Sequence, residues 1–174
     1  MSTVTIVGSG MMGTALCWPL SENGHTIRLV GTPLDEAIIS SIRTTGVHPK
    51  LQRPVPAGVE AFPVRALAQA LQGANLVVNG VSSFGVDWFT HTVGPLLQPD
   101  VPVLSVTKGL ADKNNGDLQI LPDYIDAHLL AGQRGKISLN AIAGPCTSHE
   151  LAARRQTAVV FCGKDEAILW YLRS

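Results

Sequence analysis

The sequence predicts an α/β fold: a doubly wound, Rossmann-type domain with a mainly parallel sheet. Two observations favour this class. Short apolar strands alternate with helical segments along the chain, and a glycine-rich turn follows the first strand. Strands of a parallel sheet are covered by helices on both faces, so they are typically continuous apolar runs. We therefore expect one domain over residues 1–174, with ligands bound beyond the carboxyl ends of its strands.

The first strand, Val4–Val7, leads directly into a G-x-G-x-x-G turn formed by Gly8, Ser9, Gly10, Met11, Met12 and Gly13. In the dinucleotide-binding form of this turn, the first glycine permits the bend out of the strand. The second lets a pyrophosphate approach the backbone, and the third lets the helix pack on the sheet. The N–H groups at the start of that helix favour phosphate. An ordinary strand-to-helix turn is the alternative, since 17 glycines in 174 residues make chance matches easy.

The later elements follow in chain order. Runs of β-branched and other apolar residues predict strands at His25–Val30, Val59–Phe62, Asn75–Val81, Val101–Val106, Ile137–Ala143 and Thr157–Cys162. Helical patterns predict helices at Pro33–Thr44, at Val64–Leu71, within Val86–Leu97, at Leu118–Leu130, at Ser148–Arg154 and from Asp165 to Ser174. Gly46–Pro56, with three prolines, is expected to be a loop. Pro19 lacks an N–H and should kink or shorten the first helix.

The composition is that of a globular protein, with 45% hydrophobic and 15% charged residues. Lys plus Arg and Asp plus Glu each number 13, so no basic surplus points to nucleic acid or to a membrane surface. No apolar run is long enough for membrane insertion. Five histidines without ligand spacing indicate no metal site. Cys17, Cys146 and Cys162 form no C-x-x-C pair, and such thiols are typical of a reducing compartment, so we expect a cytoplasmic protein.

Several loops leave predicted strands at the same edge of the sheet. They are Gly8–Gly13, Gly31–Thr32, Ser82–Phe84, Thr107–Gly109 and Gly144–Ser148. We expect them to line one crevice.

Four segments, in this order, resemble the amino-terminal domain of NAD(P)-dependent glycerol-3-phosphate dehydrogenases: GSGMMGTAL, ENGHTIRLV, VTKGL at Val106–Leu110 and AGPCTSHELA at Ala143–Ala152. The resemblance covers nearly the whole chain. It implies an oxidoreductase that interconverts glycerol 3-phosphate and dihydroxyacetone phosphate by hydride transfer with a nicotinamide cofactor. It also implies a second, helical domain that supplies the principal catalytic lysine and most of the substrate-phosphate site. That domain is absent from this chain, so we expect a fragment that binds cofactor and turns over little or nothing.

The resemblance also implies roles for individual residues. Lys108 matches the first active-site lysine, so it is the expected catalytic residue and contacts both substrate and cofactor. Its ammonium would stabilise alkoxide charge at the substrate oxygen. Gly144 and Cys146 are expected at the substrate, although Cys146 replaces a hydroxyl residue and a thiol is a weaker donor. The other expected cofactor contacts, beside the glycine turn, are Thr32, Ser82, Phe84 and Ser148.

The cofactor is expected to be NAD, because no basic residue follows the second strand to hold a 2′-phosphate; NADP is the alternative. There are two alternative functions. One is that of a related NAD(P)-dependent hydroxy-acid or alcohol dehydrogenase, and the other is that of a nucleotide-binding module without turnover. The expected partners are a small phosphorylated substrate and the missing carboxy-terminal helical domain. Trp170 and Leu172 are expected to form an apolar patch, which makes a homodimer one possible assembly.

Overall fold

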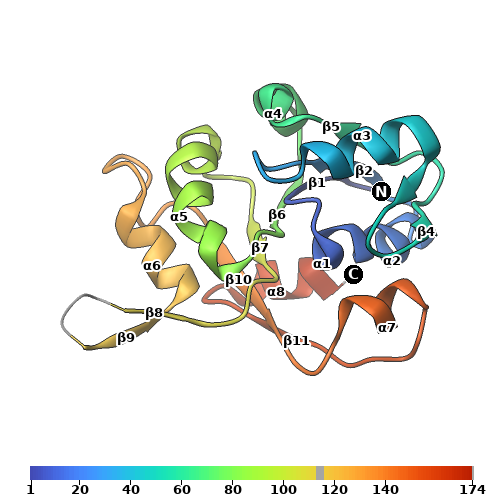
Figure 1. The fold of residues 1–174 in the computed structure, drawn as a ribbon. Coiled ribbons are helices and arrows are strands. Elements are labelled where there is room, and N and C mark those ends of the chain that lie inside the picture. The colour runs from blue at the N-terminus through green and yellow to red at the C-terminus, as the bar shows by residue number, and fades with distance from the viewer. Residues whose placement is uncertain (113–115, 174) are drawn as a thin grey trace.

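The computed structural model describes residues 1–112 and 116–173. Its main sheet contains β1 (Thr3–Val7), β2 (Thr26–Val30), β5 (Glu60–Phe62), β6 (Leu76–Asn79), β7 (Val103–Ser105), β10 (Leu139–Ala143) and β11 (Val160–Cys162). The strand order is β11-β10-β7-β6-β1-β2-β5 (Figure 1). In the described part of the chain, every neighbouring pair is parallel except β10 and β11. The mainly parallel sheet expected from the sequence is confirmed.

Helices cover both faces of this sheet. They are α1 (Met11–Ala15), α2 (Cys17–Glu22), α3 (Glu36–Thr45), α4 (Leu67–Leu71), α5 (Val86–Trp88), α6 (Leu121–His128), α7 (Ser148–Ala152) and α8 (Glu166–Arg173). Tighter or wider helical turns lie at η1 (Val64–Ala66), η2 (Ser83–Gly85), η3 (Phe89–Val93) and η4 (Gly94–Leu96). In Figure 1, α5 and α6 lie on one side of the sheet, and α1 and α2 lie on the other.

The alternation of strand side chains produces two apolar cores. Val77 on β6 packs with α4, α5 and α6, whereas its neighbour Val78 packs with α2 and α3. On β7, Val103 and Leu104 divide between the two faces in the same way. Both faces are therefore buried, which is why the strands are continuous apolar runs.

The order in which strands are added to the sheet reverses at the adjacent, parallel strands β1 and β6. From β1 the sheet continues through β2 to β5, and from β6 it continues the other way through β7 to β10. Such a switch point leaves a crevice beyond the carboxyl ends of the two central strands, where ligands of open α/β sheets bind. The glycine turn after β1 lies at this point.

Two expected elements are wrong in detail. The predicted loop Gly46–Pro56 contains a short hairpin, β3 (Val47–His48) with β4 (Arg53–Pro54). The predicted helix Leu118–Leu130 begins only at Leu121, because its first residues form β9 (Leu118–Ile120), which pairs with β8 (Leu110–Asp112). Pro122 in the first helical turn marks the true start, since proline favours that position.

Other predicted boundaries shift by a few residues. The helix predicted from Pro33 begins at Glu36, and the strand predicted from Thr157 begins at Val160. The predicted end of the last helix at Ser174 lies outside the described residues. The first helix is interrupted at Leu16, between α1 and α2, and Pro19 lies within α2. Pro19 has no N–H to donate to the Ala15 carbonyl, four residues earlier.

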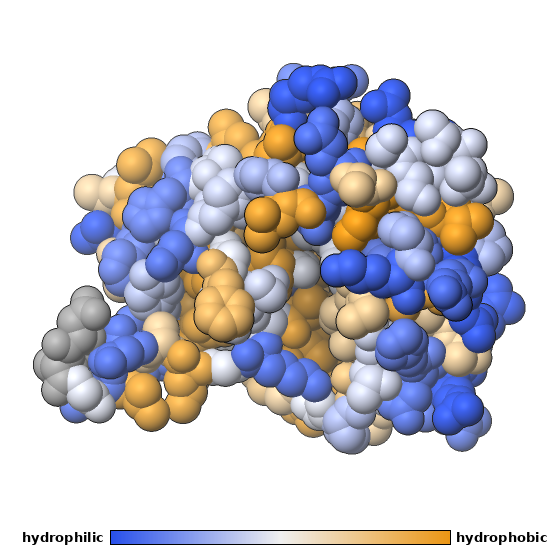
Figure 2. Space-filling view, in the orientation of Figure 1, coloured by the Kyte–Doolittle hydropathy of each residue, from blue (hydrophilic) through white to orange (hydrophobic). Residues whose placement is uncertain are grey.

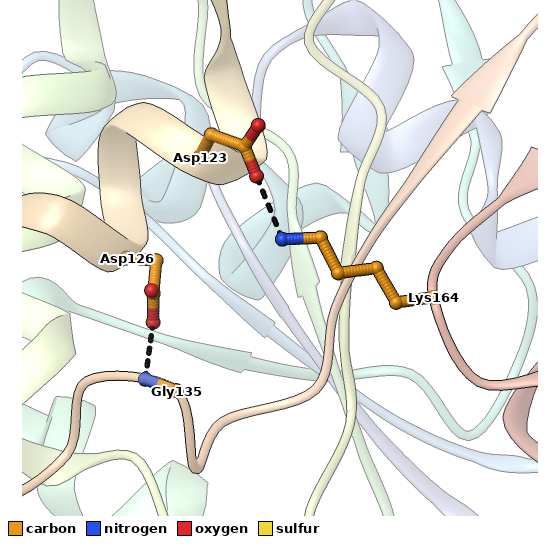
Figure 3. Close-up of polar contacts among 4 residues, drawn as sticks. All are labelled: Asp123, Asp126, Gly135 and Lys164. Atoms are coloured by element: carbon orange, nitrogen blue, oxygen red, sulfur yellow. Dashed lines mark hydrogen bonds and ion pairs between the residues drawn. The ribbon is translucent and has the colours of Figure 1, made fainter.

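Polar contacts tie α6 to the loop before β10 and to the segment after β11 (Figure 3). The Lys164 ammonium lies 3.0 Å from a carboxylate oxygen of Asp123, which raises the pKa of Lys164. The Asp126 carboxylate accepts the Gly135 N–H at 2.8 Å. Both members of the ion pair are largely in water, so the pair adds little to the free energy of unfolding.

Among the residues that the structure describes, no helix has the length and apolar character needed to cross a bilayer.

Candidate functional site

The three glycines of the turn differ in what surrounds them. Gly8 has a φ of +110°, and a Cβ there would lie 2.7 Å from the Gly80 carbonyl carbon. A Cβ on Gly13 would lie 2.0 Å from the Gly8 carbonyl oxygen. Around Gly10, apart from its chain neighbours and its own helix, no described atom lies within 4 Å of the corresponding position. Gly8 and Gly13 are therefore required by packing, whereas Gly10 leaves open space over the backbone that a pyrophosphate would fit.

Helix α1 begins at Met11 with backbone N–H groups that no earlier helical turn can bond. No side chain caps this end of the helix. Those N–H groups and the bare backbone of Gly10 together make a suitable environment for an anion.

Both peptide groups of Ser9 are held by side chains from other parts of the chain. Its N–H donates to the Asp35 carboxylate at 3.2 Å. Its carbonyl accepts the Thr14 hydroxyl at 3.0 Å and the Nε2–H of His48 at 3.0 Å. Hydrogen bonds from the loop between β2 and α3 and from the β3–β4 hairpin therefore hold the glycine turn in place.

Thr32 lies after β2, where an adenosine ribose is expected, but its hydroxyl is already engaged. The same Asp35 oxygen that holds Ser9 also accepts the Thr32 N–H and the Thr32 hydroxyl, both at 2.9 Å. Sequence reasoning missed Asp35, because it stands three positions beyond Thr32, at the start of α3, instead of at the end of the strand. The carboxylate nonetheless reaches back to the crevice.

His48 is also a residue that the sequence did not indicate. Its imidazole is fully buried, and Nδ1 accepts the Leu51 N–H at 3.0 Å, so the proton is on Nε2. Burial lowers the pKa of His48, which keeps the ring neutral. A single histidine in a proline-rich segment has no spacing pattern that would reveal this contact.

Buried polar contacts join the carboxyl ends of β6 and β7. The Asn79 amide donates to the Ser105 hydroxyl at 2.9 Å, and the Thr107 hydroxyl donates to the Val81 carbonyl at 2.6 Å. They fix the backbone immediately before Lys108. The Lys108 ammonium donates to the Gly144 carbonyl after β10. The structure thus brings together two of the residues expected at the substrate.

Lys108 and Cys146 both line an apolar cavity of about 290 Å³, which runs along the sheet face toward α2 and α8. Met12 from the glycine turn lines it as well. Figure 2 shows hydrophobic side chains in a hollow between the part around α5 and α6 and the part around α1 and α3. The Cys146 side chain is buried, and its thiol lies 3.9 Å from the Thr147 carbonyl.

The remaining expected contacts lie at the same edge of the sheet but not in this cavity. Ser82 precedes η2, and Ser148 begins α7. Phe84 is 96% exposed, so it is not a core residue. It lines a separate hollow with Asp87 and Tyr124. Among the described residues, no group of His, Cys, Asp or Glu is arranged to hold a metal ion.

Comparison with known proteins identifies the family and the fold. Residues 3–169 match the family described as NAD-dependent glycerol-3-phosphate dehydrogenase N-terminus. The NADP(+)-dependent glycerol-3-phosphate dehydrogenase of Archaeoglobus fulgidus is 36% identical over 168 residues, which are 94% of this chain and 47% of that protein. A glycerol-3-phosphate dehydrogenase [NAD(P)+] from Cronobacter sakazakii is 30% identical over 95% of this chain and 46% of its own length.

Solved structures share the fold. The crystal structure of a glycerol-3-phosphate dehydrogenase from Coxiella burnetii superposes with a TM-score of 0.82 at 24% identity. The match covers 98% of this chain and 49% of that one. This chain therefore spans about half the length of the relatives it matches. It belongs to the family of NAD-dependent glycerol-3-phosphate dehydrogenase amino-terminal domains.

Proposed function

We propose that this chain is the cofactor-binding half of an oxidoreductase that interconverts glycerol 3-phosphate and dihydroxyacetone phosphate with NAD(P). The observation that carries the proposal is the open backbone of Gly10 at the switch point between β1 and β6. Its neighbours Gly8 and Gly13 allow close packing of the turn, so the phosphate position stays free of side chains.

In this proposal each expected residue has a distinct role. The turn Gly8–Gly13 binds the pyrophosphate through the N–H groups at the start of α1. Thr32 lies at the adenosine ribose, and Ser82, Phe84 and Ser148 contact the nicotinamide half. The bound nicotinamide supplies or accepts the hydride. Lys108 orients the substrate oxygen and stabilises the alkoxide charge that develops there.

The substrate contacts beside Lys108 are Gly144 and Cys146. The Gly144 carbonyl holds the Lys108 ammonium at the carboxyl edge of the sheet, which sets where its charge lies. Substrate phosphate binding is assigned to a carboxy-terminal helical domain, so residues 1–174 act as one nucleotide-binding unit that does not turn over alone. We place the protein in the cytoplasm, on the support of its three free thiols.

NADH binding to the 174-residue chain tests this function. We expect the fluorescence of NADH to report saturable binding, and Gly10→Val to weaken it at least about tenfold, because the side chain occupies the pyrophosphate position. Gly132→Val is the matched control, since Gly132 also faces open space but lies far along the chain from the turn. Equal affinity of the Gly10 and Gly132 variants would remove the turn from the site.

Turnover separates this function from a binding-only module. Added alone to dihydroxyacetone phosphate and NADH, the chain should show no oxidation of NADH. A protein that joins it to the carboxy-terminal half of a relative should oxidise NADH with this substrate. A joined protein that prefers a hydroxy acid or an alcohol would instead support a related dehydrogenase.

A further inference from the structure

We propose that His48 is a positioning residue for nucleotide binding, acting through the Ser9 carbonyl to aim the Gly10 N–H at the pyrophosphate. The proposal rests on the proposed function, because it assigns a role within the same nucleotide site. His48 lies on the β3–β4 hairpin, 39 residues from Ser9 in sequence. It does not line the apolar cavity with Lys108.

The contact is directional, because both ring nitrogens of His48 have defined partners. Nδ1 accepts the Leu51 N–H at 3.0 Å, which leaves the proton on Nε2 for the Ser9 carbonyl, also at 3.0 Å. The imidazole is fully buried, so water does not compete for either bond. The hairpin therefore presents one fixed donor to the glycine turn.

The peptide between Ser9 and Gly10 transmits this contact to the ligand. In a trans peptide the C=O and the following N–H point in opposite directions. Because His48 and Thr14 both donate to the Ser9 carbonyl, the Gly10 N–H points away from them. Asp35 holds the Ser9 N–H and resists rotation of the preceding peptide.

The same anchoring explains why a residue without a side chain can serve here. Beyond its chain neighbours and its own helix, nothing described lies within 4 Å of a Cβ position on Gly10, so no side chain packs over this position. The Gly10 carbonyl accepts the Thr14 N–H at 3.0 Å, which holds the peptide that follows Gly10 and not the one that carries its N–H. Glycine allows many orientations of the preceding Ser9–Gly10 peptide, because it has no Cβ to restrict its backbone. The hydrogen bonds to Ser9 supply the order that packing does not, so the donor is oriented before the nucleotide arrives.

Two neutral variants separate the contact to Ser9 from the contact to Leu51. In His48→Gln the amide N–H occupies the position of Nε2 and keeps the bond to the Ser9 carbonyl. In His48→Asn the shorter side chain keeps an acceptor near Nδ1 for Leu51 but does not reach Ser9. We expect His48→Asn to weaken NADH binding about tenfold. His48→Gln should stay within about threefold of the wild type.

Adenosine, which has no pyrophosphate, is the second probe. Its affinity, measured by ligand-observed NMR, should change less than about twofold in either variant, whereas general damage to the domain would weaken adenosine and NADH alike. His91→Leu is the control, because His91 is an exposed histidine on η3 whose Nδ1 lies 2.8 Å from the Asp87 carbonyl oxygen. It should bind both probes as the wild type does.

Wild-type NADH binding is measured first, so that failure of the proposed function is recognised separately. If the wild type binds NADH, the inference is overturned when His48→Asn binds as tightly as wild type. It is also overturned when His48→Gln is as weak as His48→Asn, or when adenosine binding falls in parallel. Should His48→Asn not fold, His48→Leu fills the buried volume without a donor and carries the same expectation.

Discussion

At the scale of single residues, the buried imidazole of His48 makes stability depend on pH. Burial lowers its pKa from the usual 6.5, against smaller opposing effects of the Ser9 carbonyl and Asp35. Below about pH 6.5 the unfolded chain therefore binds more protons than the folded chain, so the free energy of unfolding falls as the pH drops. Protonation also places a hydrogen on Nδ1, where the Leu51 N–H needs an acceptor.

Urea unfolding followed at about pH 7.5 and about pH 5.5 measures this dependence. Other groups titrate over the same range, so the comparison is with His48→Gln, which cannot be protonated. The variant should lose less stability on acidification than the wild type. Identical losses in the two proteins would mean that His48 is not the group responsible.

Asp35 is the residue that should select between NAD and NADP. Its carboxylate already takes the donors of Ser9 and Thr32, and its charge would lie near a 2′-phosphate. We expect Asp35→Asn to raise the affinity for NADPH relative to NADH by about tenfold, since one repulsive charge is removed. Competition of each nucleotide against NADH fluorescence measures the ratio. A ratio unchanged by Asp35→Asn would place the adenosine ribose away from this carboxylate.

Lys108 is expected to act on the chemical step and not on cofactor affinity. In the joined protein described above, Lys108→Ala should lower kcat by about 10²–10³-fold, which is typical for loss of one group that stabilises an oxyanion. NADH affinity should change little, because the pyrophosphate site lies at the other loop. Initial rates with dihydroxyacetone phosphate and NADH titrations measure the two effects. Undiminished turnover would exclude Lys108 from the active site.

At the scale of elements, the packing of α1 against β1 depends on Gly13. A methyl group there would overlap the Gly8 carbonyl oxygen, so the helix would have to move away from the strand. We expect Gly13→Ala to lower the free energy of unfolding by about 1–3 kcal/mol, as overpacking of a close contact does. Gly10→Ala, with open space around it, should change stability by less than about 0.5 kcal/mol. Denaturant titration compares them, and equal losses would contradict the close contact.

Elements that bury apolar side chains were the ones that sequence periodicity predicted. β6 and β7 belong to that class, because both of their faces lie in apolar cores. The hairpin of β8 and β9 was missed, since it carries exposed apolar residues such as Leu118 that fit a helix pattern equally well. In the candidate site, the glycine turn and Lys108 followed from local motifs. His48 and Asp35 did not, because their contacts depend on how distant segments pack.

At the scale of the whole molecule, helices cover both faces of the sheet, but the edge formed by β11 carries exposed apolar side chains. β11 is an edge strand, and Val160 on it is 60% exposed. On α8, which packs beside β11, Trp170 is 59% exposed with the Arg173 guanidinium over its ring, whereas Leu172 packs partly against the core. Of the two residues expected to form an apolar patch, Trp170 is the one that faces water. An exposed edge strand next to exposed apolar side chains favours association with another chain.

We therefore expect the isolated chain to self-associate as its concentration rises, through the end of the sheet that carries β11 and α8. Trp170→Lys should shift sedimentation velocity profiles toward the monomer, because it places a charge where apolar contact would form. Leu34→Lys is the matched control, since Leu34 is 93% exposed but lies between β2 and α3. A chain that stays monomeric at high concentration, or that responds equally to both substitutions, would show that this end of the sheet does not mediate association.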